Sequence, residues 1–109
     1  MEAFNRQDVD TLAALYTEDA VNYQVAEAPV VGRDEIRAMF AAGFAAAEMV
    51  CLIENLFEDG EWAILEWRDP LGLRGYGLFQ VVEGRIVFQR GYWDKLTFLR
   101  QHGLPVPLD

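Results

Sequence analysis

Near the end of the chain, Arg85–Trp93 shows a period of two, in which every second residue belongs to one of two sets: Ile86, Phe88, Arg90 and Tyr92 alternate with Val87, Gln89, Gly91 and Trp93. This period predicts a strand whose two faces differ in character. Asp94 follows at the position of a helix N-cap, and Gly103 with Pro105 marks the end of the short helix after it. A polar and aromatic strand that runs into a helix start is a place where a small α+β domain can line a pocket.

The segments before this strand predict helices first and strands afterwards. Asp8 is placed to cap a helix whose apolar residues recur at i, i+3, i+4 and i+7, and Asp34–Ala47 is the longest predicted helix. The predicted strands are Val21–Val25, Met49–Glu58, Trp62–Arg68, Leu73–Val82 and Arg85–Trp93. This order predicts an α+β fold, in which a curved antiparallel sheet wraps around the long helix with a pocket between them.

Length, charge and cysteine content narrow the class of protein. The 109 residues suffice for one domain with a hydrophobic core, and 52% apolar residues argue against disorder. The net charge of −9 argues against nucleic acid and anionic membranes as partners. The single Cys51 excludes an internal disulfide and fits a reducing cytoplasm, where we expect the protein to reside. Its apolar neighbours predict a buried structural thiol.

Neither a metal nor a nucleotide cofactor is expected. One His and one Cys cannot form a His/Cys metal site, and the carboxylates lack the spacing of a calcium loop. Gly72, Gly75 and Gly77 lie in a strand-like segment without the following helix that a dinucleotide or phosphate loop requires.

The inward face of the predicted fold is rich in aromatic residues. Its expected members are Trp67, Trp93, Phe79, Phe40, Phe44 and Phe98, joined by the polar Gln89. These residues form either a plain core or the walls of an apolar pocket for a small hydrophobic molecule. Gly75, Gly77 and Gly91 on the same face indicate either room for a ligand or strong sheet curvature, because glycine is costly inside strands. Gln89 needs a hydrogen-bonding partner there.

The outward face of the sheet is also apolar. Trp62, Ile64, Tyr76 and Leu78 are expected on it. Because so apolar a face should be covered, we predict a homodimer that forms through the sheet. Glu66 shares this face and is expected in a surface or interface ion pair.

Two blocks, Leu15–Phe40 and Phe79–Asp94, carry a resemblance to a known superfamily. The matching pieces are Thr17–Val21 before the first strand, Gly32–Ile36 at a helix start, Glu83–Ile86 in a turn, and Tyr92–Asp94 before the last helix. They resemble the nuclear transport factor 2-like superfamily, and within it SnoaL-like domains and relatives of limonene-epoxide hydrolase and ketosteroid isomerase. The resemblance implies one cone-shaped, cystatin-like domain over residues 1–109, with a first helix shorter than the family's.

The resemblance transfers catalytic residues only in part. Tyr23 and Asp69 match a Tyr and an Asp of the epoxide hydrolases, whereas Trp67, Gly91 and Val25 occupy the other three positions of that site. The general base of ketosteroid isomerases corresponds to Tyr23, which cannot replace a carboxylate. An acid/base of the kind used by SnoaL-type cyclases corresponds to Asp69.

Asp69 therefore has two interpretations. It is the best candidate acid/base, since a carboxylate beside Trp67 at a pocket mouth suits proton transfer. It also opens an Asp-Pro-Leu-Gly turn, where Asp is favoured because it binds local amides. Tyr23 is either a hydrogen-bond donor to a ligand or a core aromatic. Three functions remain open: cofactor-free acid/base catalysis as a hydrolase, isomerase or cyclase, binding of a small hydrophobic molecule, and a scaffold with a filled core.

Overall fold

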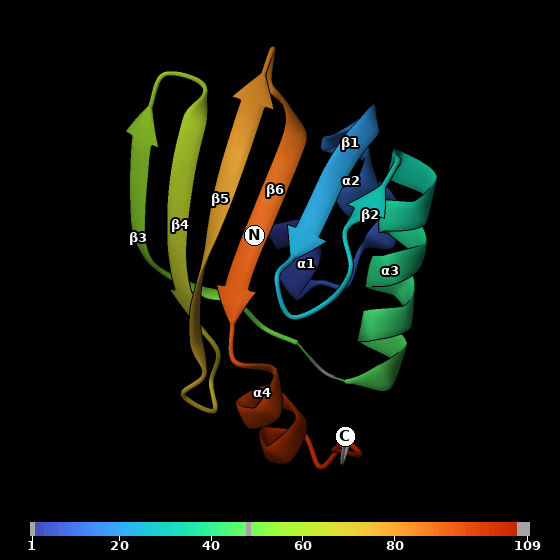
Figure 1. Cartoon of the computed structure of the whole chain (residues 1–109), viewed down its shortest axis with the longest axis vertical. Helices are drawn as coiled ribbons and strands as arrows, with labels where there is room; N and C mark the ends of the chain where they lie inside the picture. The colour runs from blue at the N-terminus through green and yellow to red at the C-terminus, as the bar shows by residue number, and fades with distance from the viewer. Residues whose placement is uncertain (1, 48, 107–109) are drawn as a thin grey trace.

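The computed structural model describes residues 2–47 and 49–106. Helices and two strands form the first part of the chain, a strand meander follows, and a last helix ends the described part (Figure 1). The helices are α1 (Glu2–Asn5), α2 (Val9–Ala14), α3 (Arg33–Ala46) and α4 (Lys95–Gln101). The strands are β1 (Tyr16–Gln24), β2 (Val30–Val31), β3 (Leu52–Asp59), β4 (Trp62–Arg68), β5 (Arg74–Val82) and β6 (Arg85–Trp93). The predicted α+β class is confirmed.

The described strands form one six-stranded sheet with the order β2-β1-β6-β5-β4-β3. The meander from β3 to β6 is antiparallel throughout, as predicted. The pairing of β1 with β6 is parallel, so the sheet is mixed rather than wholly antiparallel. Strand β1 also begins earlier than expected. Tyr16 opens the strand and pairs with Ile86, five residues before the predicted start at Val21.

Both predicted helix caps are present. The Asp8 side chain accepts a hydrogen bond from the Thr11 backbone N–H at 3.2 Å, and the Asp94 side chain accepts one from Leu96 N–H at 3.1 Å. Each cap satisfies one of the backbone donors that a helix start leaves unpaired. The Asp94 cap lets β6 pass directly into α4, which lies beyond the end of the sheet in Figure 1.

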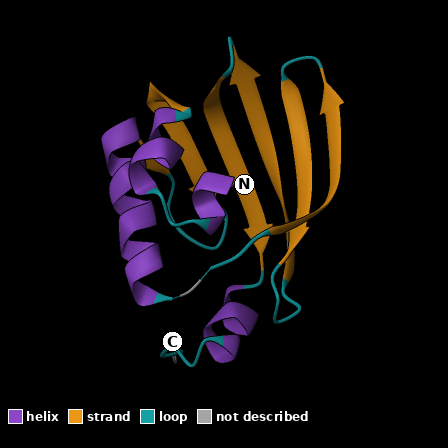
Figure 2. Cartoon of the chain, turned by 180° about the vertical axis from the view of Figure 1, so that it is seen from behind, coloured by secondary structure: helices purple, strands orange, loops and turns teal. Residues whose placement is uncertain are grey.

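The core lies between the helices and strands β1 and β6. Its buried members are Ala3, Leu12, Tyr16, Ala20, Ile36 and Phe40, with Phe44 and Ile86 packed against them. Figure 2 shows α2 and α3 gathered over the β1 side of the sheet, which leaves the same face of β3 and β4 uncovered. Ile53 and Leu56 pair with Trp67 and Leu65 on that concave face, and both are 55% exposed. The core is therefore concentrated at one side of the cone.

Three strand glycines make room for side chains of the protein itself. A Cβ atom on Gly75 would lie 2.5 Å from Trp67 Cζ2, and one on Gly77 would lie 2.8 Å from Phe79 Cε2. A Cβ atom on Gly91 would collide with the Gln24 amide. Of the two interpretations of these glycines, room for a ligand needs correction, because side chains of the protein itself occupy the space above all three positions.

Replacing Gly75 with Ala should destabilise the protein by about 1–3 kcal/mol, the usual cost of overpacking. The added methyl would meet both the Trp67 indole and the Tyr92 carbonyl oxygen, the latter at 2.6 Å. Urea unfolding followed by circular dichroism measures the change. Gly43→Ala is the matched control, since it lies in α3 and meets only the flexible end of Met49 at 3.1 Å. It should be neutral or stabilising by up to about 1 kcal/mol through helix propensity. Equal losses in both variants would contradict this account.

Candidate functional site

A hydrogen-bonded polar cluster lies on the concave face where β1 meets β6. The Tyr16 hydroxyl donates to Gln89 Oε1, and Asn22 Nδ2 lies 3.4 Å from the Tyr16 hydroxyl oxygen and 3.3 Å from Gln89 Oε1. Asn22 is fully buried and Tyr16 almost so. The parallel register causes this meeting, because it places Asn22 directly beside Gln89. The predicted need of Gln89 for a partner is therefore met within the protein.

The cluster continues toward the end of β6 through Gln24 and Trp93. Gln24 Nε2 donates to Asn22 Oδ1 at 2.7 Å, and the Trp93 indole N–H donates to Gln24 Oε1 at 2.8 Å. A chain of bonds thus runs from a phenol through three amides to an indole. Burial raises the pKa of Tyr16 above the ordinary phenol value, so its hydroxyl stays protonated. These groups donate and accept hydrogen bonds among themselves, and they do not exchange protons near neutral pH.

Asp69 lies just beyond the end of β4 and is only 7% exposed. Its Oδ1 atom accepts hydrogen bonds from the backbone N–H groups of Leu71 and Leu73, both at 2.9 Å. Its own backbone N–H donates to the Leu73 carbonyl, and its carbonyl accepts from Gly72 N–H. The carboxylate thus holds its own turn together, as one of its two interpretations predicted. Neither side-chain bond uses Oδ2.

Tyr23 does not lie with Asp69. It is beside Arg90 in the β1–β6 pairing and alternates with the inward-facing Asn22 and Gln24, so its side chain is on the convex face. The structure therefore does not bring Tyr23 and Asp69 together on one face of the sheet. The cause is the register of β1, whose inward positions are Ala20, Asn22 and Gln24. Asn22 was not anticipated from the sequence, because an Asn within a strand is usually solvent-exposed.

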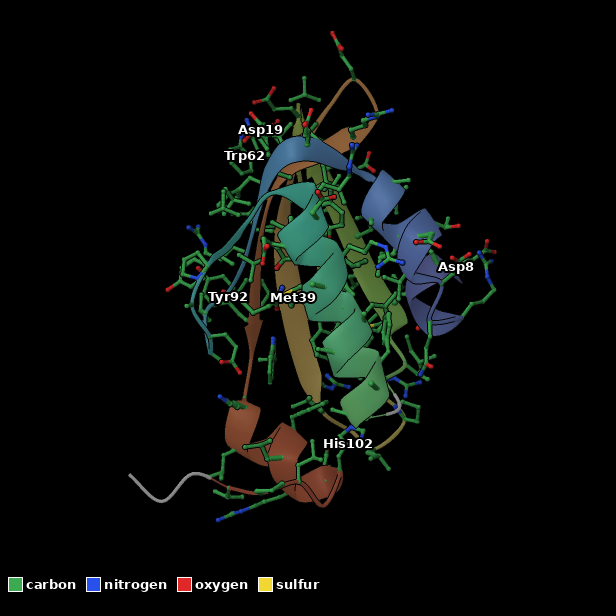
Figure 3. All side chains as sticks on the ribbon, turned by 90° about the vertical axis from the view of Figure 1, so that its right-hand side faces the viewer. Asp8, Asp19, Met39, Trp62, Tyr92 and His102 are labelled. Carbon is green, nitrogen blue, oxygen red and sulfur yellow. The ribbon has the colours of Figure 1, made fainter. Side chains whose placement is uncertain are left out.

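The predicted aromatic residues do lie on the concave side. Trp67, Gly75 and Trp93 occupy one row across β4, β5 and β6, and Phe79 lies beside Gln89 in another. The Trp93 ring packs edge-on against Phe98 of α4 at 5.5 Å between centroids. Phe40 and Phe44 belong instead to the core under α3, where their rings stack at 6.0 Å. In Figure 3, Met39 of α3 lies on the helix side of the sheet, whereas Trp62 and Tyr92 lie on the opposite side.

Two surface hollows are lined by described residues. The larger, about 590 Å³, lies between the end of α1 and the last turn of α3, beside Asn5 and Phe44. The smaller, about 210 Å³, lies near Asp10, Arg37 and Arg85. Neither lies between the aromatic residues and the sheet, so the apolar pocket stays a prediction. Within 2–47 and 49–106, no three His, Cys, Asp or Glu side chains gather to hold a metal ion. No helix in these ranges is long and apolar enough to cross a membrane.

Cys51 lies just before β3, and the Asn5 side chain holds its backbone by two hydrogen bonds of 2.8 and 2.9 Å. Burial, with a smaller contribution from the Asp69 carboxylate, raises the pKa of the thiol to about 12. A thiol with so high a pKa is a poor nucleophile at neutral pH. This agrees with the predicted structural role.

The curved sheet, the helices gathered on its concave side and the α4 segment at its end define the nuclear transport factor 2-like class of α+β proteins. The family model described as SnoaL-like domain matches residues 1–89, and the chain belongs to this family. No curated protein matches the chain in sequence.

Solved structures agree on the fold. A protein from Catenulispora acidiphila with a ketosteroid isomerase-like fold, in complex with trimethylamine, has a TM-score of 0.83 and 18% identity, with 96% of this chain and 92% of that one covered. An M. tuberculosis LEH-like epoxide hydrolase has a TM-score of 0.76 and 24% identity, covering 91% and 80%. The epoxide hydrolase/cyclase-like enzyme SalBIII has a TM-score of 0.76 and 22% identity, covering 87% and 84%. At these identities the similarity shows the fold alone.

Cys51 should react very slowly with a thiol reagent in the folded protein. At pH 8 a thiol with a pKa of about 12 has a roughly thousand-fold smaller thiolate population than one at the ordinary value of 9.0. Ellman's reagent with native and denatured protein measures the ratio. The unfolded thiol ionises near pH 9 while the folded one stays protonated, so this contribution to stability is complete below pH 9 and is lost as pH rises toward 12. Cys51→Ala should weaken the alkaline loss of stability. Equal labelling rates in both states would contradict the burial of the thiol.

Proposed function

We propose that this SnoaL-like domain is a non-catalytic module that binds a small apolar molecule with a hydrogen-bonding group on its concave face. The observation that carries the proposal is the chemistry of the polar cluster. Gln24, Gln89 and Trp93 are only partly buried and carry hydrogen-bonding groups, and the buried Tyr16 and Asn22 hold them in place. None of these five side chains has a proton to exchange near pH 7. Such a polar cluster suits the binding of a ligand by hydrogen bonds rather than acid/base chemistry.

The uncovered strands supply the apolar part of the binding surface. Ile53 and Leu56 on β3 are exposed on the same face as Trp67, one strand away. Phe79 and Trp93 follow on β5 and β6 and are only partly buried. A flat apolar ligand in contact with these side chains would remove their surface from water, and each 100 Å² covered would stabilise the complex by about 2.5 kcal/mol before entropic costs. Its polar group would then be near Gln89 and Gln24.

The relatives support a small organic ligand. The Catenulispora acidiphila protein was solved with trimethylamine, a small cation with apolar methyl groups. Aromatic rings attract such cations through their faces, and Trp67, Phe79 and Trp93 offer three rings on this side of the sheet. Trimethylamine is therefore a sensible first probe, together with neutral epoxides and ketones.

Acid/base catalysis is the second candidate, favoured by one observation. The Asp69 carboxylate is buried beside the end of the Trp67 strand, and Oδ1 makes both of its turn contacts. Oδ2 is thus left for a substrate proton, as a hydrolase, isomerase or cyclase without cofactor would require. Tyr23 has no part in this version because it faces the other side of the sheet.

Ligand binding should quench or shift the tryptophan fluorescence, because Trp67 and Trp93 border the concave face. Titrations with trimethylamine, limonene epoxide and a ketosteroid test the proposal. Gln89→Leu should weaken binding about tenfold or more through the lost hydrogen bond, whereas Leu71→Ala, in an exposed loop, should leave it unchanged. Asp69→Asn keeps an Oδ1 acceptor and should also bind normally. No spectral change with any probe would contradict this choice of ligand class. Turnover that disappears in Asp69→Asn would favour catalysis instead.

We also propose that the convex face joins two copies of the chain. Trp62, Ile64 and Tyr76 on this face are each at least 40% exposed, and Phe57 beside Ile64 is 62% exposed. Tyr76 stacks on Tyr92 at 4.7 Å, which extends the apolar surface onto β6. Contiguous apolar surface of this kind marks an interface in a water-soluble protein. A second copy is the natural occupant, since a two-fold axis would bury the same patch on both subunits.

Light scattering after size exclusion should give twice the mass of the chain at micromolar concentration. Ile64→Asp places a charge in the middle of the apolar surface and should yield a folded monomer, because an unpaired charge at an interface core opposes association. Leu71→Asp is the control, as Leu71 is 56% exposed but lies in the loop after β4. A wild-type monomer would refute the dimer, and so would an Ile64→Asp variant that remains dimeric.

A further inference from the structure

Arg90 occupies an unusual position on the convex face. It lies on β6 between Leu78 and Tyr23, in the same row as Ile64 on β4. Its guanidinium carbon is 5.6 Å from the centroid of the Phe88 ring and 5.8 Å from that of Tyr92. Its Nε atom is buried and has no hydrogen-bond acceptor among the described residues. A cation is thus held within an aromatic surface with one donor unsatisfied.

A buried N–H of a guanidinium group is costly to leave without an acceptor. Contact with aromatic faces offsets part of the lost hydration but accepts no hydrogen bond in the plane of the guanidinium group. Because Nε itself is buried, a carboxylate that approached from outside the sheet would bind the terminal guanidinium nitrogens of the partly exposed Arg90 and balance its charge. The partner of this face should therefore present a carboxylate to Arg90.

Glu66 on β4 is the carboxylate on this face that matches Arg90. It lies in the row of Tyr76 and Tyr92, one row away from Arg90 and two strands across. Neighbouring strands are about 4.8 Å apart, so β5 separates the two side chains within one subunit. Glu66 Oε1 accepts a hydrogen bond from Asn55 at 2.7 Å, which orients the carboxylate and leaves Oε2 for another donor.

The charges of the face also favour a second copy of this chain. The whole chain carries a net charge of −9, so two copies repel each other in most orientations. The convex face, in contrast, carries Arg68, Arg74 and Arg90, which is three of the nine Lys and Arg residues. Glu54, paired with Arg74 at 3.5 Å, and Glu66 balance much of this charge. Self-association through this face therefore avoids the repulsion that other faces would impose.

We infer that the convex faces of two copies pack about a two-fold axis with Arg90 of each copy bound to Glu66 of the other. This inference rests on the proposed dimer and adds the contact that sets its alignment. Two-fold symmetry makes the pair twice, and the axis runs between the two residues rather than through either one. Because the axis does not pass through Arg90, the two Arg90 side chains of the dimer do not face each other. Two apolar sheet faces can pack in several alignments, and the Arg90–Glu66 pair would select one of them. Selecting a register in this way is the best-supported role of buried charge pairs.

Charge exchange tests the pair directly. Arg90→Glu and Glu66→Arg should each weaken the dimer at least tenfold, because each leaves two like charges facing each other. The double variant restores opposite charges and should dimerise within about threefold of wild type. Arg100→Glu on α4 and Glu35→Arg on α3, both exposed and away from this face, are the matched controls and should dimerise normally. Sedimentation equilibrium measures the dissociation constants, and circular dichroism checks the fold of each variant.

The outcomes separate the two proposals. A wild-type monomer would refute the dimer and the pair together. A wild-type dimer with single variants that dimerise normally, or a double variant that stays monomeric, would overturn the pair while the dimer stands. If a charge-reversed variant fails to fold, Arg90→Gln and Glu66→Gln replace it. Both neutral variants should weaken the dimer less than reversal does, and Arg90→Gln should also reduce its dependence on salt.

Discussion

The parallel pairing of β1 with β6 is the constraint on which the rest of the structure depends. It joins the helical first half of the chain to the strand meander of the second half, across about 67 residues between Asn22 and Gln89. Without it, α2 and α3 would cover a two-stranded fragment that cannot bury their apolar faces. The same register brings Asn22 against Gln89 and Gln24 over Gly91. The pairing of β1 with β6 therefore produces both the hydrophobic core and the polar cluster.

Local patterns predicted much of the fold. The boundaries of β4 and β6 match Trp62–Arg68 and Arg85–Trp93, because each strand is rich in β-branched and aromatic residues and is bounded by turn residues. The caps at Asp8 and Asp94 were equally clear, since they depend only on the next few residues. The parallel pairing was not predicted, because no local pattern records which distant strand becomes a neighbour.

The unpredicted pairing of β1 with β6 explains the differences between the predicted and the observed candidate site. Tyr16 fits an apolar helix position as well as a strand start, and only the pairing with Ile86 decides between them. The resemblance pointed to Tyr23 on this strand, whereas the observed register turns Asn22 and Gln24 inward and Tyr23 outward. Gln89 and Trp93 were identified correctly as inward-facing because they lie on β6, whose register follows from its hairpin with β5. The same hairpin puts Arg90 on the convex face.

The close packing of Trp67 against Gly75 and of Phe79 against Gly77 has a consequence for the evolution of the family. The volume that a ligand would need is filled by these side chains, and the backbone does not have to move to free it. A single codon change from Trp or Phe to a smaller residue would open the surface above a glycine while the strands keep their positions. One backbone can thus acquire or lose a cavity within a few mutations. This offers a physical route by which a single cone-shaped fold comes to include proteins named as hydrolases, cyclases and isomerase-like folds.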